Sequence, residues 1–98
     1  MDDQQTRDQI EQHAAAVVRG DMDAVVADFT AGLRPHVPEI ARALPQPVTS
    51  ADLLSVDVGS TESVAMIRYS GQSGGVTVRS RWQDEGGRAV IVHAEPVE

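Results

Sequence analysis

The sequence predicts an α+β domain in which helices come first and an antiparallel sheet follows. Apolar residues recur at helical spacing over residues 6–29, whereas residues 50–95 contain segments in which apolar and polar side chains alternate. Turn-forming residues rich in glycine separate these segments. Helices and strands that are segregated along a chain are typical of α+β domains, and 98 residues suit a single domain over residues 1–98.

Residues 6–19 are predicted to form the first helix. Its apolar positions recur three or four residues apart, which places them on one helix face. That face holds Ile10, His13, Ala14 and Val17. Thr6 can cap the start of this helix, and Gly20 can adopt the left-handed conformation that ends it.

A second helix is predicted to begin directly after a corner formed by Gly20 and Asp21. The Asp21 side chain can accept a hydrogen bond from a free backbone N–H of the next turn, and Asp23 adds negative charge at the positive end of the helix dipole. The predicted buried face of this helix holds Met22, Val25, Val26 and Phe29. Gly32 is expected to end the helix.

Prolines divide the next part of the chain. Residues 33–38 contain Pro35 and Pro38, and we expect extended chain there because each proline restricts the residue before it. Pro38 suits the first turn of a short third helix over residues 39–44. Pro45 and Pro47 are expected to end that helix.

Four strands are predicted, and they should form an antiparallel meander. They cover residues 50–58, 61–70, 75–84 and 88–95. In a hairpin with an even-length loop, the residues that flank the loop face each other and share a side of the sheet. The expected facing pairs are Val58 with Thr61, Ser70 with Gly75, and Gln83 with Arg88.

This register divides the strands into two faces. The face expected to pack on the helices holds Leu54, Val56, Val58, Ala65, Ile67, Tyr69, Val76, Val78, Ser80, Trp82, Ala89, Ile91 and His93. Three helices cannot cover both faces, so we expect a homodimer through the outer sheet face. That face holds Leu53, Val64, Met66, Arg68, Arg79, Arg81, Val90 and Val92.

Composition excludes several classes of function. Eight arginines, no lysine and fifteen acidic residues give a net charge of −7, which repels nucleic acid. The first ten residues lack the pattern of a signal peptide, and no apolar run is long enough to span a membrane, so we expect a cytoplasmic protein. Without cysteine, and with three histidines that are not closely spaced, we expect no metal site. No glycine-rich phosphate loop precedes a helix, so we expect no cofactor.

The order of elements provides a family resemblance. A long helix, the Gly20-Asp21 corner, a second helix that ends in Phe29, a short helix and an antiparallel sheet follow the pattern of the NTF2-like superfamily. The chain resembles this superfamily, which has a cystatin-like α+β fold and includes SnoaL-like and ketosteroid isomerase-like enzymes. The resemblance implies a cone whose open end is a pocket. Such pockets serve enzymes and non-catalytic binding domains alike, so the fold does not choose between them.

Six polar or aromatic residues are candidates for that pocket. His13 and His93 could act as acid or base near neutral pH, and Asp28 could act as a base in an apolar setting. Tyr69, Ser80 and Trp82, together with His93, are the candidate ligand contacts. The alternative for His13 is a histidine at the edge of the core, for His93 a strand-end residue, and for Asp28 a solvated helix residue. The alternative for the aromatic residues is a role in the core.

Departures from the catalytic members of the family favour a binding role. Steroid isomerase-like sites use a carboxylate base after the second helix, together with a Tyr and a protonated Asp, whereas Leu33, Arg34 and Pro35 follow that helix here. We therefore expect a non-catalytic module that binds a small apolar ligand or mediates dimerisation. The alternative is a SnoaL-like or ketosteroid isomerase-like enzyme that acts on a carbonyl compound.

Overall fold

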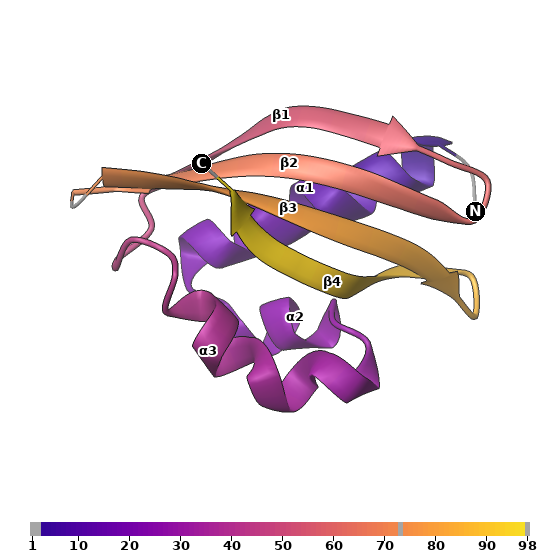
Figure 1. The fold of residues 1–98 in the computed structure, drawn as a ribbon, viewed down its shortest axis with the longest axis horizontal. Coiled ribbons are helices and arrows are strands. Elements are labelled where there is room, and N and C mark those ends of the chain that lie inside the picture. The colour runs from indigo at the N-terminus through magenta and orange to yellow at the C-terminus, as the bar shows by residue number, and fades with distance from the viewer. Residues whose placement is uncertain (1–2, 73, 98) are drawn as a thin grey trace.

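The structure, a computed structural model, describes residues 3–72 and 74–97 and confirms the α+β class (Figure 1). The helical part consists of α1 (Asp3–Arg19), α2 (Met22–Ala27), the 3-10 helix η1 (Ala31–His36) and α3 (Val37–Ala41). The strands are β1 (Ser50–Val58), β2 (Glu62–Gly71), β3 (Gly74–Glu85) and β4 (Arg88–Val97). They form an antiparallel sheet in the order β1-β2-β3-β4, with β1 and β4 at its two edges. This open sheet does not confirm the expected cone.

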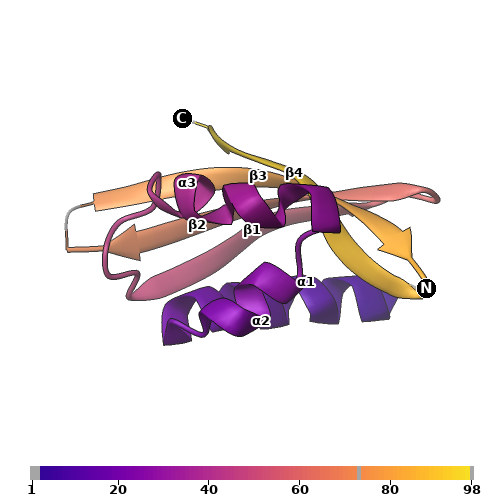
Figure 2. The same ribbon diagram turned by 90° about the horizontal axis from the view of Figure 1, so that it is seen from below.

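Both α1 and α2 lie on one side of the sheet (Figure 2). The predicted corner between them is confirmed, because Gly20 has a φ of 74° and the Asp21 side chain accepts a hydrogen bond from the Ala24 N–H at 3.2 Å. However, α1 begins at Asp3, so Thr6 is a buried helical residue and not its cap. Met22 is 47% exposed, so its prediction as a buried residue was wrong. None of the described helices is long and apolar enough to cross a bilayer.

The segment predicted as extended chain is helical. Residues 31–36 form η1, and α3 follows at once from Val37 to Ala41. A proline φ near −65° suits a helical turn as well as an extended one, and Pro38 lies in the first turn of α3, where no backbone N–H is needed. The Val37 side chain is buried, with 1% of its surface exposed, and it anchors the segment to the core.

The chain after α2 joins the edge of β4. Phe29 forms a parallel bridge with Ile91. The Ile91 N–H donates to the Asp28 carbonyl at 2.7 Å, and the Thr30 N–H donates to the Ile91 carbonyl at 2.9 Å. These bonds cover the β4 edge at Ile91 and bring the end of α2 against this strand.

The sheet register differs from the predicted one at two hairpins. Ser70 faces Gly75 as predicted. Val58, however, faces Ser63, and Arg88 faces Glu85, so both expected pairs were displaced by two residues. A displacement of two residues leaves the alternation of faces unchanged. The assignment of Ala65, Ile67, Tyr69, Trp82 and Ile91 to the buried face is therefore confirmed.

Two β-bulges change the faces locally. In β1 the register shifts between Leu53 and Ser55, so Leu53 faces Ile67 on the inner side while Leu54 is 57% exposed. The predictions for both leucines were wrong. In the pairing of β3 with β4, the shift places His93 opposite Arg81 on the outer face. Each bulge inserts one residue without altering the pattern of apolar residues, so alternation alone does not reveal it.

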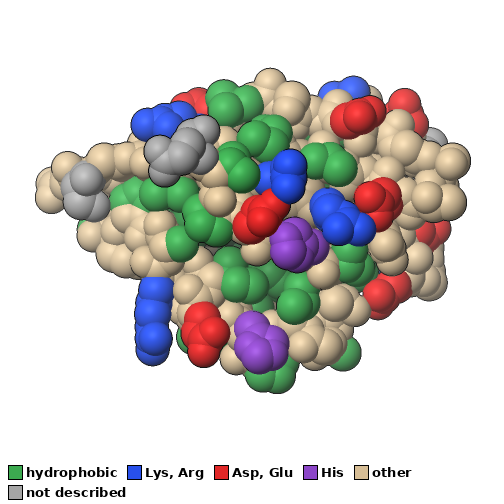
Figure 3. Space-filling model, in the orientation of Figure 1, with side chains coloured by type: hydrophobic (Ala, Val, Ile, Leu, Met, Phe, Trp, Pro, Cys, Tyr) green, Lys and Arg blue, Asp and Glu red, His purple; other side chains and the backbone are tan. Residues whose placement is uncertain are grey.

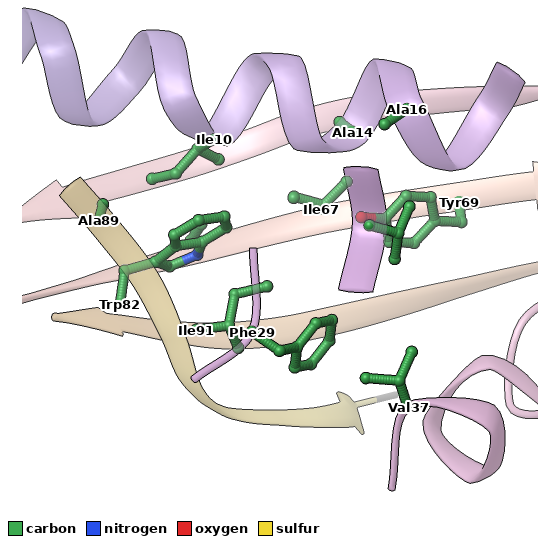
Figure 4. Packing of buried hydrophobic residues seen from close by; sticks show 12 residues of the cluster. Ile10, Ala14, Ala16, Phe29, Val37, Ile67, Tyr69, Trp82, Ala89 and Ile91 are labelled. Atoms are coloured by element: carbon green, nitrogen blue, oxygen red, sulfur yellow. The ribbon is translucent and has the colours of Figure 1, made fainter. Parts of the chain in front are cut away.

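The core lies between α1 and the inner face of the sheet (Figure 4). Its most deeply buried large side chains are Trp82, Ile10, Ile67, Ile91 and Val37. Phe29 is 3% exposed, which confirms it as a core residue. Helices, strands and the α3 segment thus all contribute to one apolar cluster.

The outer sheet face is more polar than predicted. Arg79 forms an ion pair with Glu95, Arg81 forms one with Glu62 at 3.2 Å, and His93 lies 3.5 Å from Glu95. These arginines lower the pKa of both glutamates, chiefly through side-chain hydrogen bonds. Figure 3 shows arginine, acidic and histidine side chains close together, with apolar ones around them.

The apolar part of that face is also smaller than predicted. Leu53 turns inward. Val90 is buried within the single chain, with only 6% of its surface exposed, so it adds little to an apolar outer face. Val64, Met66 and Val92 are half-buried, and Arg68 is exposed. The homodimer through this face stays a prediction.

Candidate functional site

A buried carboxylate lies at the centre of the candidate site. Asp28 follows the last residue of α2 and is only 4% exposed. Its Oδ1 accepts hydrogen bonds from Gln9 Nε2 at 2.7 Å and from Arg88 Nη2 at 2.6 Å, and its Oδ2 lies 2.9 Å from His13 Nδ1. Side chains from α1 and the start of β4 therefore converge on one carboxylate.

Arg88 ties this carboxylate to the end of α2. Its Nη1 donates to the Ala27 carbonyl at 2.7 Å, while its Nη2 reaches Asp28. A helix C-terminus carries partial negative charge on its free carbonyls, so a guanidinium is well suited to this position. The Arg88 side chain remains 46% exposed and Gln9 is half-buried, so the cluster is in contact with solvent on the side of these two residues.

His13 is held in one orientation by contacts on several sides. A carboxylate oxygen accepts hydrogen bonds, so the Nδ1 of a neutral His13 donates to Asp28 and its Nε2 is left as an acceptor. The rings of Phe29 and Trp82 meet the imidazole edge to face, with centroid distances of 6.0 and 5.4 Å. The imidazole is therefore fixed in position, with its Nδ1 directed at Asp28.

A small, mostly apolar cavity adjoins His13. Its volume is about 40 Å³, and α1, α3 and the inner face of the sheet line it. Three lining side chains carry polar groups: His13 from α1, Tyr69 from β2 and Ser80 from β3. The apolar lining consists of Val17, Val25, Phe29, Val37, Ile40, Ala41, Leu44, Val78, Ile91 and Ala94.

The two hydroxyl groups of the cavity differ in their surroundings. Ser80 accepts a hydrogen bond from Trp82 Nε1 at 2.9 Å, so its oxygen is engaged while its own proton can still be donated. Burial and the nearby Asp28 carboxylate raise the pKa of the Tyr69 hydroxyl well above its usual range. Tyr69 therefore stays a neutral hydrogen-bond donor throughout the physiological pH range.

The structure unites most, but not all, of the candidates found in the sequence. His13 and Asp28 form a direct pair, and Tyr69 and Ser80 line the cavity beside it. Trp82 packs against His13 and does not line the cavity. His93 was assigned to the inner face wrongly, because the bulge in β4 turns it outward and leaves 48% of its side chain exposed.

Sequence reasoning missed Gln9 and Arg88. Gln9 lies one turn before His13, and this spacing of four residues signals a shared helix face. Arg88 lies 60 residues from Asp28 in sequence, so no local pattern links the two. Among the described residues, no group of three potential metal ligands is found.

Comparison with known proteins identifies a fold but no family. No protein-family model and no curated protein sequence matches the chain. The solution structure of a SEC-C motif containing protein from Rhodopseudomonas palustris does match. The TM-score is 0.67 at 16% identity, over 92% of this chain and 77% of that one. At this identity the likeness shows the fold alone.

This likeness corrects the family prediction. The match is to a SEC-C motif protein, so the resemblance to the NTF2-like superfamily, with its SnoaL-like and cystatin-like descriptions, was wrong. The Gly20-Asp21 corner specifies a local turn between helices, and the alternating segments specify a meander. Neither feature depends on the chain belonging to one particular superfamily, which is why the resemblance misled.

The buried Tyr69 hydroxyl predicts a loss of stability at high pH. Its pKa is raised in the folded state, so its contribution to stability is complete below the unfolded pKa of about 10 and is lost as pH rises above that value. Tyr69 is the only tyrosine, so the tyrosinate absorbance that appears near 295 nm comes from this residue. We expect ionisation to coincide with the loss of circular dichroism above pH 10. Ionisation at pH 10 with an unchanged fold would contradict the prediction.

Proposed function

We propose that the cavity beside His13 binds a small, mainly apolar molecule that carries one hydrogen-bonding group. The proposal rests on one observation: an imidazole that is fixed by Asp28, Phe29 and Trp82 lines a mostly apolar cavity. Binding sites for small molecules are typically apolar, with a few well-oriented polar groups. His13, Tyr69 and Ser80 supply such groups from three different elements.

The chemistry of the cavity defines the class of ligand. The His13 Nε2 can accept a hydrogen bond from a hydroxyl group, and the Tyr69 hydroxyl can donate one to a carbonyl oxygen. Among the described residues, the side chains that line the cavity include no acidic residue and no arginine, so a charged ligand would lack a partner there. Small alcohols, phenols and ketones fit this description.

Binding requires α3 to move outward. A volume of about 40 Å³ holds little more than a water molecule, whereas an engineered cavity that binds benzene measures about 150 Å³. The α3 helix has five residues, and helices this short depend on packing for their stability. Since Val37, Ile40 and Ala41 of this segment all line the cavity, a shift of α3 would enlarge it directly.

The pair of His13 and Asp28 favours a second candidate, a proton-transfer enzyme. In this role the His13 Nε2 takes a proton from the carbon next to a carbonyl group, and the Tyr69 hydroxyl stabilises the enolate oxygen. The proton then returns from His13 to carbon. Asp28 already accepts from Gln9 and Arg88, so it acts as a positioning residue. Trp82 cannot serve as the donor because its N–H is bonded to Ser80.

The binding proposal can be tested by ¹⁵N NMR titration with phenol and with cyclohexanone. We expect saturating shifts of the His13, Tyr69 and α3 amides at millimolar ligand. Ala41→Leu fills the cavity and should weaken binding at least about tenfold, or 1.4 kcal/mol, whereas Ala43→Leu, at an exposed position, should leave binding unchanged. Shifts that are absent, or that do not respond to Ala41→Leu, would refute the proposal.

The same cyclohexanone samples separate binding from catalysis. In D₂O, a proton-transfer enzyme replaces the hydrogens next to the carbonyl with deuterium, and ¹H NMR follows their loss. Exchange that His13→Gln abolishes would favour the enzyme. Binding without exchange above the buffer rate would favour the non-catalytic role.

A further inference from the structure

The two edges of the sheet are covered differently. Residues 28–30 bond to the edge of β4, as described above. At the opposite edge, β1 pairs only with β2 among the described residues. Leu54, one of two large apolar residues that are exposed in the described part of the chain, lies in this strand. An open strand edge with an exposed apolar residue is a surface that proteins commonly protect or use for association.

A groove of about 660 Å³ runs between this edge and α1. In Figure 2, α1 lies beneath the sheet on the side of β1. The floor of the groove is apolar, with Ala14, Ala15 and Val18 from α1 and Ala51 and Leu53 from β1. Glu11 lies toward one end of the α1 wall and Arg19 toward the other.

The charges along this groove are self-complementary. Glu11 and Arg19 are eight residues apart, which corresponds to about 12 Å along a helix, and Ala15 lies midway between them. A two-fold axis through Ala15 would therefore bring Glu11 of each copy to Arg19 of the other. Self-complementarity of this kind is what an interface between two identical copies requires. The small side chains at the centre allow two helices to approach closely.

We propose that a second copy of this chain docks in this groove, with the two α1 helices packed antiparallel. Arg19 is free to change partners, because its present contact with Asp21 is long, at 3.5 Å, and both side chains are about half exposed. Such surface pairs contribute little to stability. The interface is distinct from the outer sheet face and does not rest on the proposed binding function.

The contact involves the helices and the groove, not a continuous sheet. Asp52 and Asp57 are exposed on β1, and the bulge at Leu54 interrupts the strand edge. Charges and bulges at an edge are devices that prevent strand-to-strand pairing. The net charge of −7 opposes association at long range, but this repulsion is screened beyond about 8 Å at 0.15 M salt.

Charge reversal tests the interface on the intact protein. Sedimentation equilibrium at 0.15 M NaCl should find a dimer for the wild type. Glu11→Arg and Arg19→Glu should each weaken it at least tenfold, because each places like charges together at both ends of the groove. The double variant should restore the dimer, and so should an equimolar mixture of the two single variants. Both residues are exposed, and circular dichroism checks that the variants fold.

Two control variants make the outcome decisive. Glu39→Arg reverses an exposed charge on α3, away from the groove, and should leave the dimer unchanged. Met66→Asp disrupts the outer sheet face, so it should leave a dimer formed through the groove unchanged and would dissociate only a dimer formed through the outer face. A wild-type monomer at several hundred micromolar would overturn the proposal. So would a dimer that tolerates both single reversals, or one that only Met66→Asp dissociates, and the last result would assign the interface to the outer face.

Discussion

Replacing Asp28 with alanine is expected to lower the free energy of unfolding by about 3–5 kcal/mol, the range found when one partner of a buried ion pair is removed. The carboxylate is 4% exposed and is bonded to Gln9, His13 and Arg88. Alanine would leave Gln9 and His13 without this acceptor, and Arg88 would keep only its bond to the Ala27 carbonyl. Typical domains are stable by only about 5–15 kcal/mol, so a loss of this size is a large fraction of the total. Urea denaturation at pH 7 measures it.

Two further substitutions separate the causes of this loss. Asp23→Ala removes an exposed carboxylate from the first turn of α2 and should cost no more than about 1 kcal/mol. Asp28→Asn keeps an acceptor for Gln9 and Arg88 and presents an N–H to His13, so it should cost less than alanine. It should also move the His13 proton from Nδ1 to Nε2, which ¹⁵N NMR of the imidazole detects. A loss below 1 kcal/mol for Asp28→Ala would contradict our account of the cluster.

Replacing Trp82 with alanine is expected to cost about 3–5 kcal/mol, because it leaves a large cavity in the core. The indole is 1% exposed, packs against His13 and donates to Ser80. Its loss would also release the imidazole that the proposed function requires. Trp82 is the only tryptophan, so unfolding of the variant should be followed by circular dichroism and not by fluorescence.

The matched control for Trp82→Ala is Leu54→Ala. Leu54 is also a large apolar residue of the sheet, but it is 57% exposed at the bulge of β1. Its replacement should change stability by no more than about 0.5 kcal/mol. Equal losses for the two variants would mean that the sheet faces are assigned incorrectly.

Local patterns predicted the elements of this fold better than their register. The helical spacing of Ile10, His13 and Ala14 correctly identified the buried face of α1. The turn at Gly20 and Asp21 was equally clear, because glycine and a capping side chain act within a few residues. The bulges could not be predicted, because Leu53 and Leu54 are both apolar and alternation does not decide which of them is buried.

The site was partly predictable for the same reasons. The sequence marked His13 and Asp28 as candidates, but their contact depends on the angle between α1 and α2, which no periodicity encodes. His93 was predicted on the inner face, but a single inserted residue in β4 places it on the outer face. Arg88 belongs to the other end of the chain, and only the long-range pairing of residues 28–30 with β4 brings it to Asp28.

The pairing of residues 28–30 with β4 also constrains the order of folding. The Asp28 carbonyl oxygen accepts a hydrogen bond from Ile91, and its carboxylate accepts one from Arg88. Two groups of Asp28 therefore find their partners only in β4. During synthesis the N-terminal helices leave the ribosome long before residue 91 does. Until β4 is in place, Asp28 lacks its partners Ile91 and Arg88, so its polar groups stay hydrated. The native packing of the end of α2 therefore requires β4.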